Sequence, residues 1–394
     1  MWQDYETQTT SVYGTDLSNV SIFDSTVTNP VTRIRNSNMN RQGLPNYNIN
    51  RQAAYFGEFS VNYDTKVFLT YSHRFEESSI FPKKSRAYDY PAGSLSIIMS
   101  DIFPSVKSKL NYWKLRGSLA STARSSAPYA NQAILNFNTG SGAGYYYDFT
   151  NANPDLVPER QKTFEIGSEF KFKGNRLSAD ITYYKTQNKN LIAENFRASY
   201  GTGFVLNTIN VGANENSGIE MVLDYQVVNK KDFTWNTRLN FNRMRNKVTE
   251  LPSSVPEFYI SDTWLYGNAR GGLTLGNPTT TITAYGYQRN TAGKILIDPA
   301  TGLPLIDPNF KVKGDRNPNF TVGWINNITY KDLRISFLWD LRVGGDIYNG
   351  TERYMTSIGR SQRTEDRMTP RVVAGVLRDG LENSANPTAN TIAV

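Results

Sequence analysis

Apolar and polar residues alternate with a period of two along several long stretches of this chain. In residues 161–173 the apolar positions are Phe164, Ile166, Phe170 and Phe172. Gly174-Asn175 follows, a dipeptide typical of tight turns. The alternation then resumes with Leu177, Ala179, Ile181 and Tyr183. Alternation over this length is typical of half-buried β-strands, so the pattern predicts a β-hairpin.

The same arrangement occurs at least three more times, around predicted turns at residues 64–65, 229–231 and 331–332. A fifth, looser pair joins the stretch Leu95 to Met99 with the stretch Trp113 to Leu119. Together these segments predict about ten strands, the best of which run 11 to 13 residues. Strands of soluble sheets are typically about 5 to 6 residues long, whereas a tilted membrane strand needs about 9 to 11.

The connections between these strands separate two kinds of sheet, because a soluble antiparallel sheet also has one apolar and one polar face. Tight turns alternate with long connections near residues 75–86, 124–160, 188–217 and 246–317, if residues 100–110 count as a moderate turn. Short periplasmic turns and long extracellular loops produce this asymmetry in membrane β-barrels. A compact soluble domain seldom contains loops of such length.

Aromatic residues lie within a few positions of the short turns, on the apolar face of the predicted strands. They are Tyr63, Phe172, Phe233, Trp235 and Tyr330. Such a grouping resembles the aromatic girdle at a membrane interface, and cross-strand aromatic packing in a soluble core is the alternative.

Composition agrees with a barrel that presents only every second residue to lipid. The mean hydropathy is −0.50, and no run of 18 apolar residues exists, which excludes transmembrane helices. The net charge of +8 comes from scattered Lys and Arg residues without a basic helix, so nucleic-acid binding is not indicated. A local excess of arginine at residues 360–371 is interpreted as a solvated loop.

Few residues offer catalytic or metal-binding chemistry. The chain has no cysteine, and its one histidine, His73, is expected to be a rim residue at the end of a strand. Asp298, Asp307 and Asp315 lie in a loop rich in Gly and Pro and could bind calcium, but their spacing fits no EF-hand. We therefore expect no metal, no cofactor and no enzymatic activity.

Three segments resemble the SusC/RagA family of TonB-dependent transporters of the Bacteroidetes outer membrane. They are NPDLVPE at residues 153–159, followed by a strand that contains Glu165 and Gly167; NSGIE at 216–220; and GDRNPNFTVG at 314–323. Each motif alone is a weak signal, whereas their order and their placement at strand entries are together specific. The resemblance covers nearly the whole chain.

This resemblance implies an all-β fold, an antiparallel transmembrane β-barrel of the TonB-dependent transporter type. The family barrel has 22 strands, so about ten strands make a partial barrel. Residues 1–394 are expected to be an internal part of the barrel domain, because no export signal follows Met1 and the last residues form a polar stretch. The plug, the TonB box and the final strands are expected to lie outside this sequence.

The resemblance further implies that the intact protein imports an oligosaccharide or oligopeptide across the cell outer membrane. A SusD-like surface lipoprotein and TonB are the expected partners. The alternatives are a soluble or surface glycan-binding β-protein without transport, and a glycosidase with two carboxylates about 5 to 10 Å apart, which no motif supports.

Candidate substrate contacts are exposed aromatics on the long loops, because sugar rings and peptide side chains both stack on aromatic faces. The best placed are Tyr145, Tyr146, Tyr147, Phe149, Tyr259, Trp264 and Tyr266. Packing of one loop against another is the alternative role for these side chains.

Overall fold

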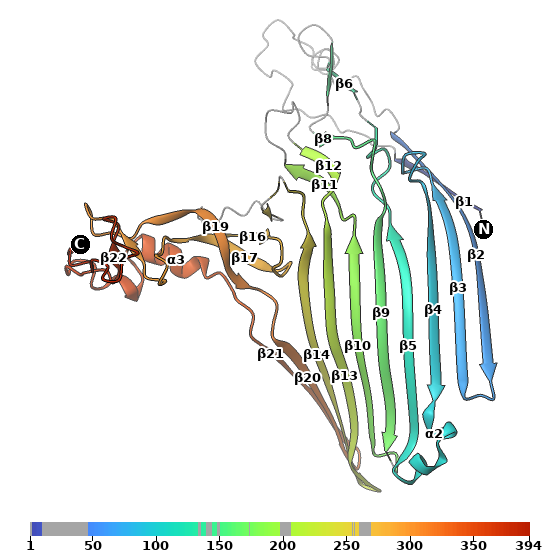
Figure 1. Cartoon of the computed structure of the whole chain (residues 1–394). Helices are drawn as coiled ribbons and strands as arrows, with labels where there is room; N and C mark the ends of the chain where they lie inside the picture. The colour runs from blue at the N-terminus through green and yellow to red at the C-terminus, as the bar shows by residue number, and fades with distance from the viewer. Residues whose placement is uncertain are drawn as a thin grey trace, which may run out of the picture. The chain divides into compact units, whose positions relative to one another are not determined.

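The computed structural model describes residues 2–9, 46–132, 135–138, 144–147, 150–172, 174–197, 206–253, 255, 257–259 and 269–394 (Figure 1). Its largest element is a sheet of eleven strands in the order β1-β2-β3-β4-β5-β9-β10-β13-β14-β20-β21. The strands are β1 (Trp2–Thr9), β2 (Asn46–Tyr63), β3 (Val67–Ser78), β4 (Ala87–Ile98), β5 (Leu110–Arg124), β9 (Glu159–Phe172), β10 (Leu177–Lys189), β13 (Ala213–Lys230), β14 (Phe233–Glu250), β20 (Phe320–Tyr330) and β21 (Leu333–Val343). No helix of the described residues is long and apolar enough to cross a membrane.

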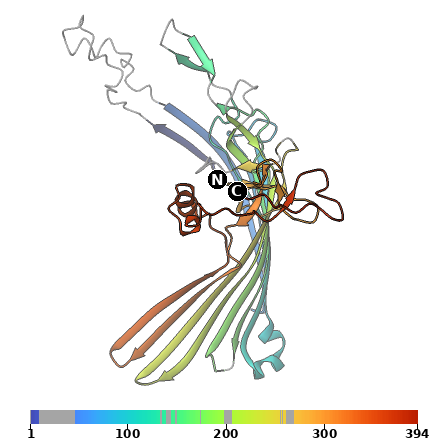
Figure 2. The ribbon, with the colours of Figure 1, turned by 90° about the vertical axis from the view of Figure 1, so that its left-hand side faces the viewer.

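The chain forms two compact units. Unit 1 comprises residues 1–107, 112–168 and 185–213. It holds β1 to β5, most of β9, the end of β10, and the short strands β6 (Leu135–Asn138), β7 (Gly144–Tyr147), β8 (Thr150–Asn151), β11 (Ile192–Arg197) and β12 (Leu206–Asn210). The turn between β2 and β3 lies at one end of the long strands, and β8, β11 and β12 lie at the other (Figure 1, Figure 2).

Unit 2 comprises residues 108–111, 169–184 and 214–394. Its long strands are β13, β14, β20 and β21. A separate four-stranded sheet contains β15 (Phe258–Tyr259), β16 (Ala269–Leu273), β17 (Thr281–Tyr287) and β19 (Ile306–Asp315). A parallel pair joins β18 (Leu296–Ile297) to β22 (Val376–Leu377). The tight turns of the long hairpins lie at the end opposite this smaller sheet (Figure 1, Figure 2).

All ten predicted strands are present in the main sheet, and the turns predicted to be tight are tight. The moderate turn at residues 100–110 contains α2 (Met99–Ile102) and the 3₁₀ helix η2 (Pro104–Ser108). Three features differ from the prediction. Strand β1 was not predicted, β2, β13 and β14 reach 18 residues each, and β3 continues through the predicted loop to Ser78. The prediction that His73 ends its strand was therefore wrong.

The apolar face of the sheet is exposed. Paired positions such as Val61, Leu69 and Leu95 form rows across β2, β3 and β4. Side chains on this face are as open as Tyr55 at 76 %, Phe59 at 63 % and Tyr63 at 73 %. Of the predicted girdle, Tyr63, Phe172 and Tyr330 are exposed, whereas Phe233 and Trp235 are half-buried. An apolar surface of this extent, on which the described residues pack no second layer, is unlike the face of a soluble sheet.

Two of the tight turns have residues in the left-handed region. Asp64 and Thr65 have φ values of 50° and 52°, and Gly174 and Asn175 have φ values of 85° and 56°. In the second of these turns the Asn175 amide donates to the Phe172 carbonyl, so Gly174 is the third residue of the turn, a position where positive φ favours glycine. In the first, the Lys66 amide donates to the Tyr63 carbonyl, so Asp64 and Thr65 are the central residues, and positive φ at both is the requirement of the type I′ turns that best match twisted hairpins. Threonine is strained there, because its branched Cβ approaches the backbone.

Thr65→Gly is therefore expected to raise the free energy of unfolding of the full-length protein by about 1 kcal/mol. Gly174→Thr is expected to lower it by about 1 to 2 kcal/mol, although a Cβ at Gly174 meets no atom within 4 Å. Urea unfolding in lipid vesicles measures both changes. Equal shifts in the same direction would contradict the assignment of backbone strain to these turns.

The NPDLVPE segment closes the end of unit 1 that lies opposite the short turns. Leu156 is fully buried in a cluster with Ile80, Phe81 and Tyr88. The Ser85 hydroxyl donates to the Leu156 carbonyl at 2.8 Å, and the Asn210 side chain bonds both the amide and the carbonyl of Val157. The motif therefore fixes the loop to the strand ends, because its leucine fills a core position and its backbone groups are paired.

The NSGIE segment contains a glycine that lies against the end of the Tyr184 side chain. A Cβ at Gly218 would lie 2.6 Å from the Tyr184 hydroxyl and 2.7 Å from its Cζ. We expect Gly218→Ala to lower the free energy of unfolding by about 1 to 3 kcal/mol, as overpacking does elsewhere. Tyr184→Ala in the same protein removes the clash, so a double-mutant cycle should recover most of this loss. Additive losses in the cycle would show that Tyr184 is not the obstacle.

Candidate functional site

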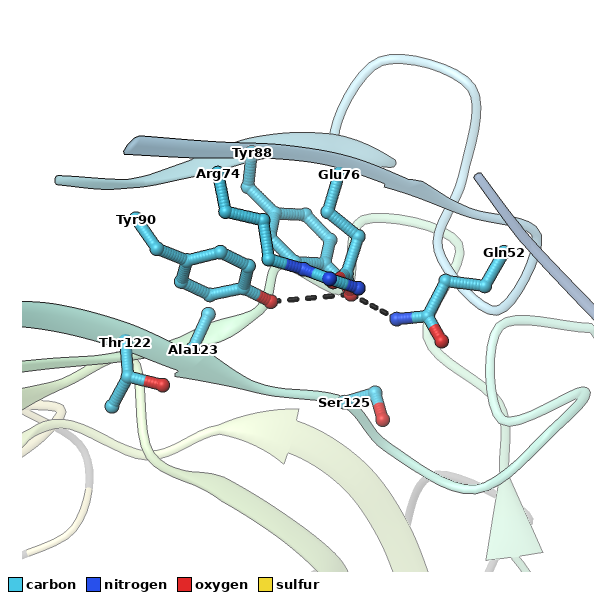
Figure 3. Close-up of a pocket in the computed structure, with 8 residues that line it drawn as sticks. All are labelled: Gln52, Arg74, Glu76, Tyr88, Tyr90, Thr122, Ala123 and Ser125. Carbon is cyan, nitrogen blue, oxygen red and sulfur yellow. Dashed lines mark hydrogen bonds and ion pairs between the residues drawn. The ribbon is translucent and has the colours of Figure 1, made fainter. Parts of the chain in front are cut away.

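The polar face of unit 1 carries a pocket at the ends of β2 to β5 that lie opposite the short turns. Its volume is about 490 Å³. The lining residues are Gln52, Arg74, Glu76, Tyr88, Tyr90, Thr122, Ala123 and Ser125 (Figure 3). Arg74 pairs across the strands with Tyr90, and Glu76 pairs with Tyr88, so two short alternating sequences place four functional groups side by side.

Glu76 lies at the centre of this pocket. Its side chain is 5 % exposed, and its Oε1 atom accepts hydrogen bonds from the Tyr88 hydroxyl at 2.8 Å and the Tyr90 hydroxyl at 3.2 Å. Oε1 also accepts from the Gln52 amide, and Oε2 accepts from Arg74 Nε at 2.7 Å (Figure 3). Four donors therefore compensate the buried carboxylate, which explains why a charge is tolerated at this depth.

The pocket combines aromatic faces with hydroxyl groups. The two tyrosine rings meet edge to face at 5.5 Å, and the Tyr90 ring is half-exposed in the pocket. The hydroxyls of Thr122 and Ser125 line its other side. Among the residues lining the pocket Glu76 is the single carboxylate, so the two acids of a glycosidase are not found here. Aromatic faces with fixed hydrogen-bonding groups suit a polar organic solute.

A second buried polar cluster lies in the four-stranded sheet of unit 2. Arg270 and Glu257 form an ion pair whose side chains are 12 % and 11 % exposed, with Arg270 Nε 3.2 Å from Glu257 Oε1. The Thr283 hydroxyl donates to the same Glu257 oxygen. The Arg270 guanidinium lies 4.0 Å from the centre of the Phe310 ring. These contacts join three strands of the sheet and the segment before β15, so the cluster stabilises the loop rather than presenting a free charge.

The predicted aromatic contacts are only partly described. Tyr145, Tyr146 and Tyr147 form β7, whose backbone pairs with β6. Tyr259 lies in β15 opposite Gly272. Phe149, Trp264 and Tyr266 lie outside the described residues.

The three aspartates considered for calcium have separate partners. Asp298 accepts from the Ala300 amide, Asp307 pairs with Lys311, and Asp315 accepts from the Asn317 amide at 3.0 Å. The Lys311 ammonium holds the pKa of Asp307 below its usual value. In the part of the chain that the structure describes, no group of three His, Asp or Glu residues could hold a metal ion.

His73 lies on the apolar face of β3 rather than at a strand end. Its ring stacks on Phe75 at 4.2 Å, Nδ1 is 2.9 Å from the Tyr71 hydroxyl, and Nε2 is 3.4 Å from the Asp89 carboxylate. These contacts indicate a packing role for His73 where the apolar face meets polar side chains.

The sequence interpretation missed the pocket residues, because the segment after Phe75 was assigned to a loop. A signal was available in the sequence. Arg74 and Glu76 continue the polar positions of β3, and Tyr88 and Tyr90 have the same spacing in β4. Extending the alternation forward from Ser72 to Glu76, and back from Leu95 to Tyr88, would have placed these groups on the polar face.

Comparison with known proteins gives one consistent family. The family model described as "TonB dependent receptor-like, beta-barrel" matches residues 2–366. TonB-dependent receptor P3 of Formosa agariphila is 26 % identical over 325 residues, which cover 75 % of this chain and 32 % of that protein. TonB-dependent receptor SusC of Bacteroides thetaiotaomicron is 26 % identical over 296 residues, 72 % of this chain and 28 % of that protein.

A solved structure shares the fold. The RagAB peptide importer in its closed-closed state superimposes with a TM-score of 0.64 at 21 % identity, covering 79 % of this chain and 36 % of that chain. The chain thus spans about a third of the length of the relatives it matches.

Proposed function

Because this chain belongs to the TonB dependent receptor-like β-barrel family, we propose that it forms part of the wall of an outer-membrane transporter. The transporter imports an oligosaccharide or oligopeptide too large for porins. The observation that carries this proposal is the exposed apolar face of the long strands, combined with short turns at one strand end and long loops at the other. In this arrangement the apolar face contacts lipid and the polar face lines the lumen.

The edge of the sheet supports a longer barrel. Among the described residues no strand pairs with β21 on the side away from β20, and both faces of β21 are exposed. Unpaired backbone groups are too costly in hydrocarbon to be left at the edge of a membrane sheet. We expect further strands of a full-length protein, in a barrel of about 22 strands, to pair with this edge. A plug and a TonB box would belong to the same protein.

A soluble glycan-binding protein is the alternative. Its sheet would bury the apolar face in a core or under a second layer. The side chains of Tyr55, Phe59 and Tyr63, which form an exposed row along β2, would then be buried. The exposed row therefore favours the membrane wall.

We assign the capture of substrate to the long loops and to a SusD-like surface lipoprotein that closes over them. TonB would then act on the plug with energy from the proton gradient of the inner membrane. The aromatic residues Tyr145 to Tyr147, Phe149, Tyr259, Trp264 and Tyr266 remain the proposed loop contacts. Alanine at Trp264 and Tyr146 should weaken substrate binding, by about 1 to 3 kcal/mol for each lost aromatic anchor. Unchanged affinity in both variants would remove these residues from the proposal.

The experiment that tests the function is deletion of the gene for the full-length protein, followed by measurement of uptake and growth on panels of glycans and peptides. We expect growth to fail on one substrate class and to return with the wild-type gene. When the proton gradient of the inner membrane is dissipated, the wild-type gene should not restore uptake, because TonB-driven transport needs that gradient. Unchanged growth and uptake on every substrate of both panels would overturn the proposal.

A further inference from the structure

The apolar face of unit 1 has a groove where a flat membrane surface would be expected. Its volume is about 630 Å³. It crosses β3, β4, β5 and β9, and its apolar walls include Leu69, Leu95, Leu115, Leu119, Phe164 and Ile166. Both its size and its apolar lining lie in the range of sites that bind an organic ligand.

Two glycines create this groove. Gly93 pairs with Leu119, and Gly117 pairs with Leu95, so each glycine stands beside a leucine of the neighbouring strand. Successive residues of a strand point to opposite faces of the sheet, and both glycines occupy positions that belong to the apolar face. A Cβ at Gly93 would lie 4.0 Å from the Thr70 carbonyl oxygen, and one at Gly117 would lie 3.7 Å from that of Glu165. The backbone therefore leaves room for larger side chains, and neither glycine is required by a positive φ.

Charged residues lie next to the groove in the direction of the long loops. Lys162 precedes Phe164 by two residues of β9, which places both on the same face. Among the described residues Lys162 has no ion-pair partner and is exposed. Farther along the strands, Arg160 Nη1 lies 3.5 Å from Asp89 Oδ1, and Asp89 Oδ2 lies 3.4 Å from His73 Nε2. Apolar walls with a free cation at one end match an apolar chain that carries an anionic group at one end.

We propose that this groove binds one acyl chain of an anionic lipid of the outer leaflet, whose head group contacts Lys162. The inference rests on the membrane position given under the proposed function, because only that position exposes the groove to lipid. The long-loop end of the strands is the extracellular end in such barrels, so the cation lies at the level of the outer-leaflet head groups. A neutral lipid would fill the same walls but would gain nothing from Lys162.

The test uses native mass spectrometry of the full-length protein in mild detergent. The probes are phosphatidylglycerol and phosphatidylcholine with identical acyl chains. Wild-type protein should retain phosphatidylglycerol over phosphatidylcholine. Gly93→Leu together with Gly117→Leu fills the groove and should reduce retention of both lipids about tenfold. A loss of this size corresponds to about two methylene groups of the acyl chain that are no longer buried. Lys162→Gln should reduce retention of phosphatidylglycerol alone, by about fivefold.

Gly57→Leu is the matched control. Gly57 lies on the apolar face of β2 opposite His73, no atom lies within 4 Å of its Cβ position, and it does not line the groove. Its variant should retain lipid like the wild type. If the double leucine variant does not fold, the alanine pair fills the groove in part, and a photoreactive acyl chain on wild-type protein should label Leu119 or Ile166.

Three results would overturn the inference. Equal retention by the groove-filled variant and the wild type would show that lipid binds elsewhere, while the membrane wall would stand. Loss of a protein dimer, rather than of lipid, in the groove-filled variant would make the groove a contact between copies of the chain. Wild-type protein that stays monodisperse without detergent and binds neither lipid would overturn the membrane position together with the groove.

Discussion

Replacing Glu76 with alanine is expected to lower the free energy of unfolding by about 2 to 4 kcal/mol and, under the proposed transport function, to reduce substrate uptake. The carboxylate accepts from Arg74, Gln52 and two tyrosines, and its removal leaves these donors without their acceptor. Tyr88 also packs in the core around Leu156, so the change should extend to the NPDLVPE loop. Urea unfolding and whole-cell uptake by the full-length protein measure the two effects.

Two further variants separate stability from binding in this pocket. Glu58→Ala removes an exposed carboxylate from the polar face of β2 and should change the stability by less than about 0.5 kcal/mol. Tyr90→Phe keeps the ring and removes one donor to Glu76, so the aromatic face that the pocket offers to a solute should persist. If Glu76→Ala leaves stability and uptake like those of Glu58→Ala, the pocket has no organising role.

Arg270→Ala is expected to be the most damaging single change in unit 2. It leaves Glu257 buried without its cation and removes the guanidinium from the Phe310 ring. Breaking a buried ion pair on one side costs about 3 to 5 kcal/mol. Because the contacts are local to the four-stranded sheet, we expect hydrogen exchange to accelerate in β16 and β17 while the long strands keep their protection.

Arg238→Ala is the matched control for this experiment. Arg238 also pairs with a carboxylate through two nitrogens, Nη2 lying 3.1 Å from Asp224 Oδ2, but these side chains are 52 % and 41 % exposed. Exposed pairs contribute about 1 kcal/mol or less. Equal exchange rates in the two variants would mean that burial of the Arg270 pair has no energetic consequence.

The sequence predicted the hairpins because alternation and turn chemistry are local signals. Gly174-Asn175 favours a turn because both residues tolerate a left-handed backbone. The apolar positions on either side of this turn specify which face of each strand is apolar. The points where the alternation ends likewise predicted where the long loops begin. Family motifs predicted three strand entries: β9 and β20 do begin within the first and third motifs, whereas the NSGIE motif lies inside β13, which begins at Ala213. The structure gives two of these motifs a packing reason in Leu156 and Gly218.

The pocket and the groove depend on pairing between strands, which one sequence does not specify. Glu76 is buried only because Tyr88 and Tyr90 lie opposite β3, and the groove exists only because Gly93 and Gly117 fall on adjacent strands. Strand β1 was missed since its residues Trp2 to Thr9 are mostly polar and show no apolar alternation. The small sheets within the long loops were missed because their strands, only two to ten residues long, are too short for a clear alternation.

Under the proposed function, the long strands present one face to lipid and the other to water. This chain has no cysteine, so once any cysteines in the rest of the full-length protein are replaced, single cysteines can be introduced and spin-labelled at successive positions of β3 from Phe68 to Ser72 in lipid vesicles. Accessibility to oxygen, which partitions into lipid, should be high at Leu69 and Tyr71. Accessibility to a water-soluble nickel chelate should be high at Phe68, Thr70 and Ser72. Access of the nickel chelate to both sets of positions would contradict the membrane wall.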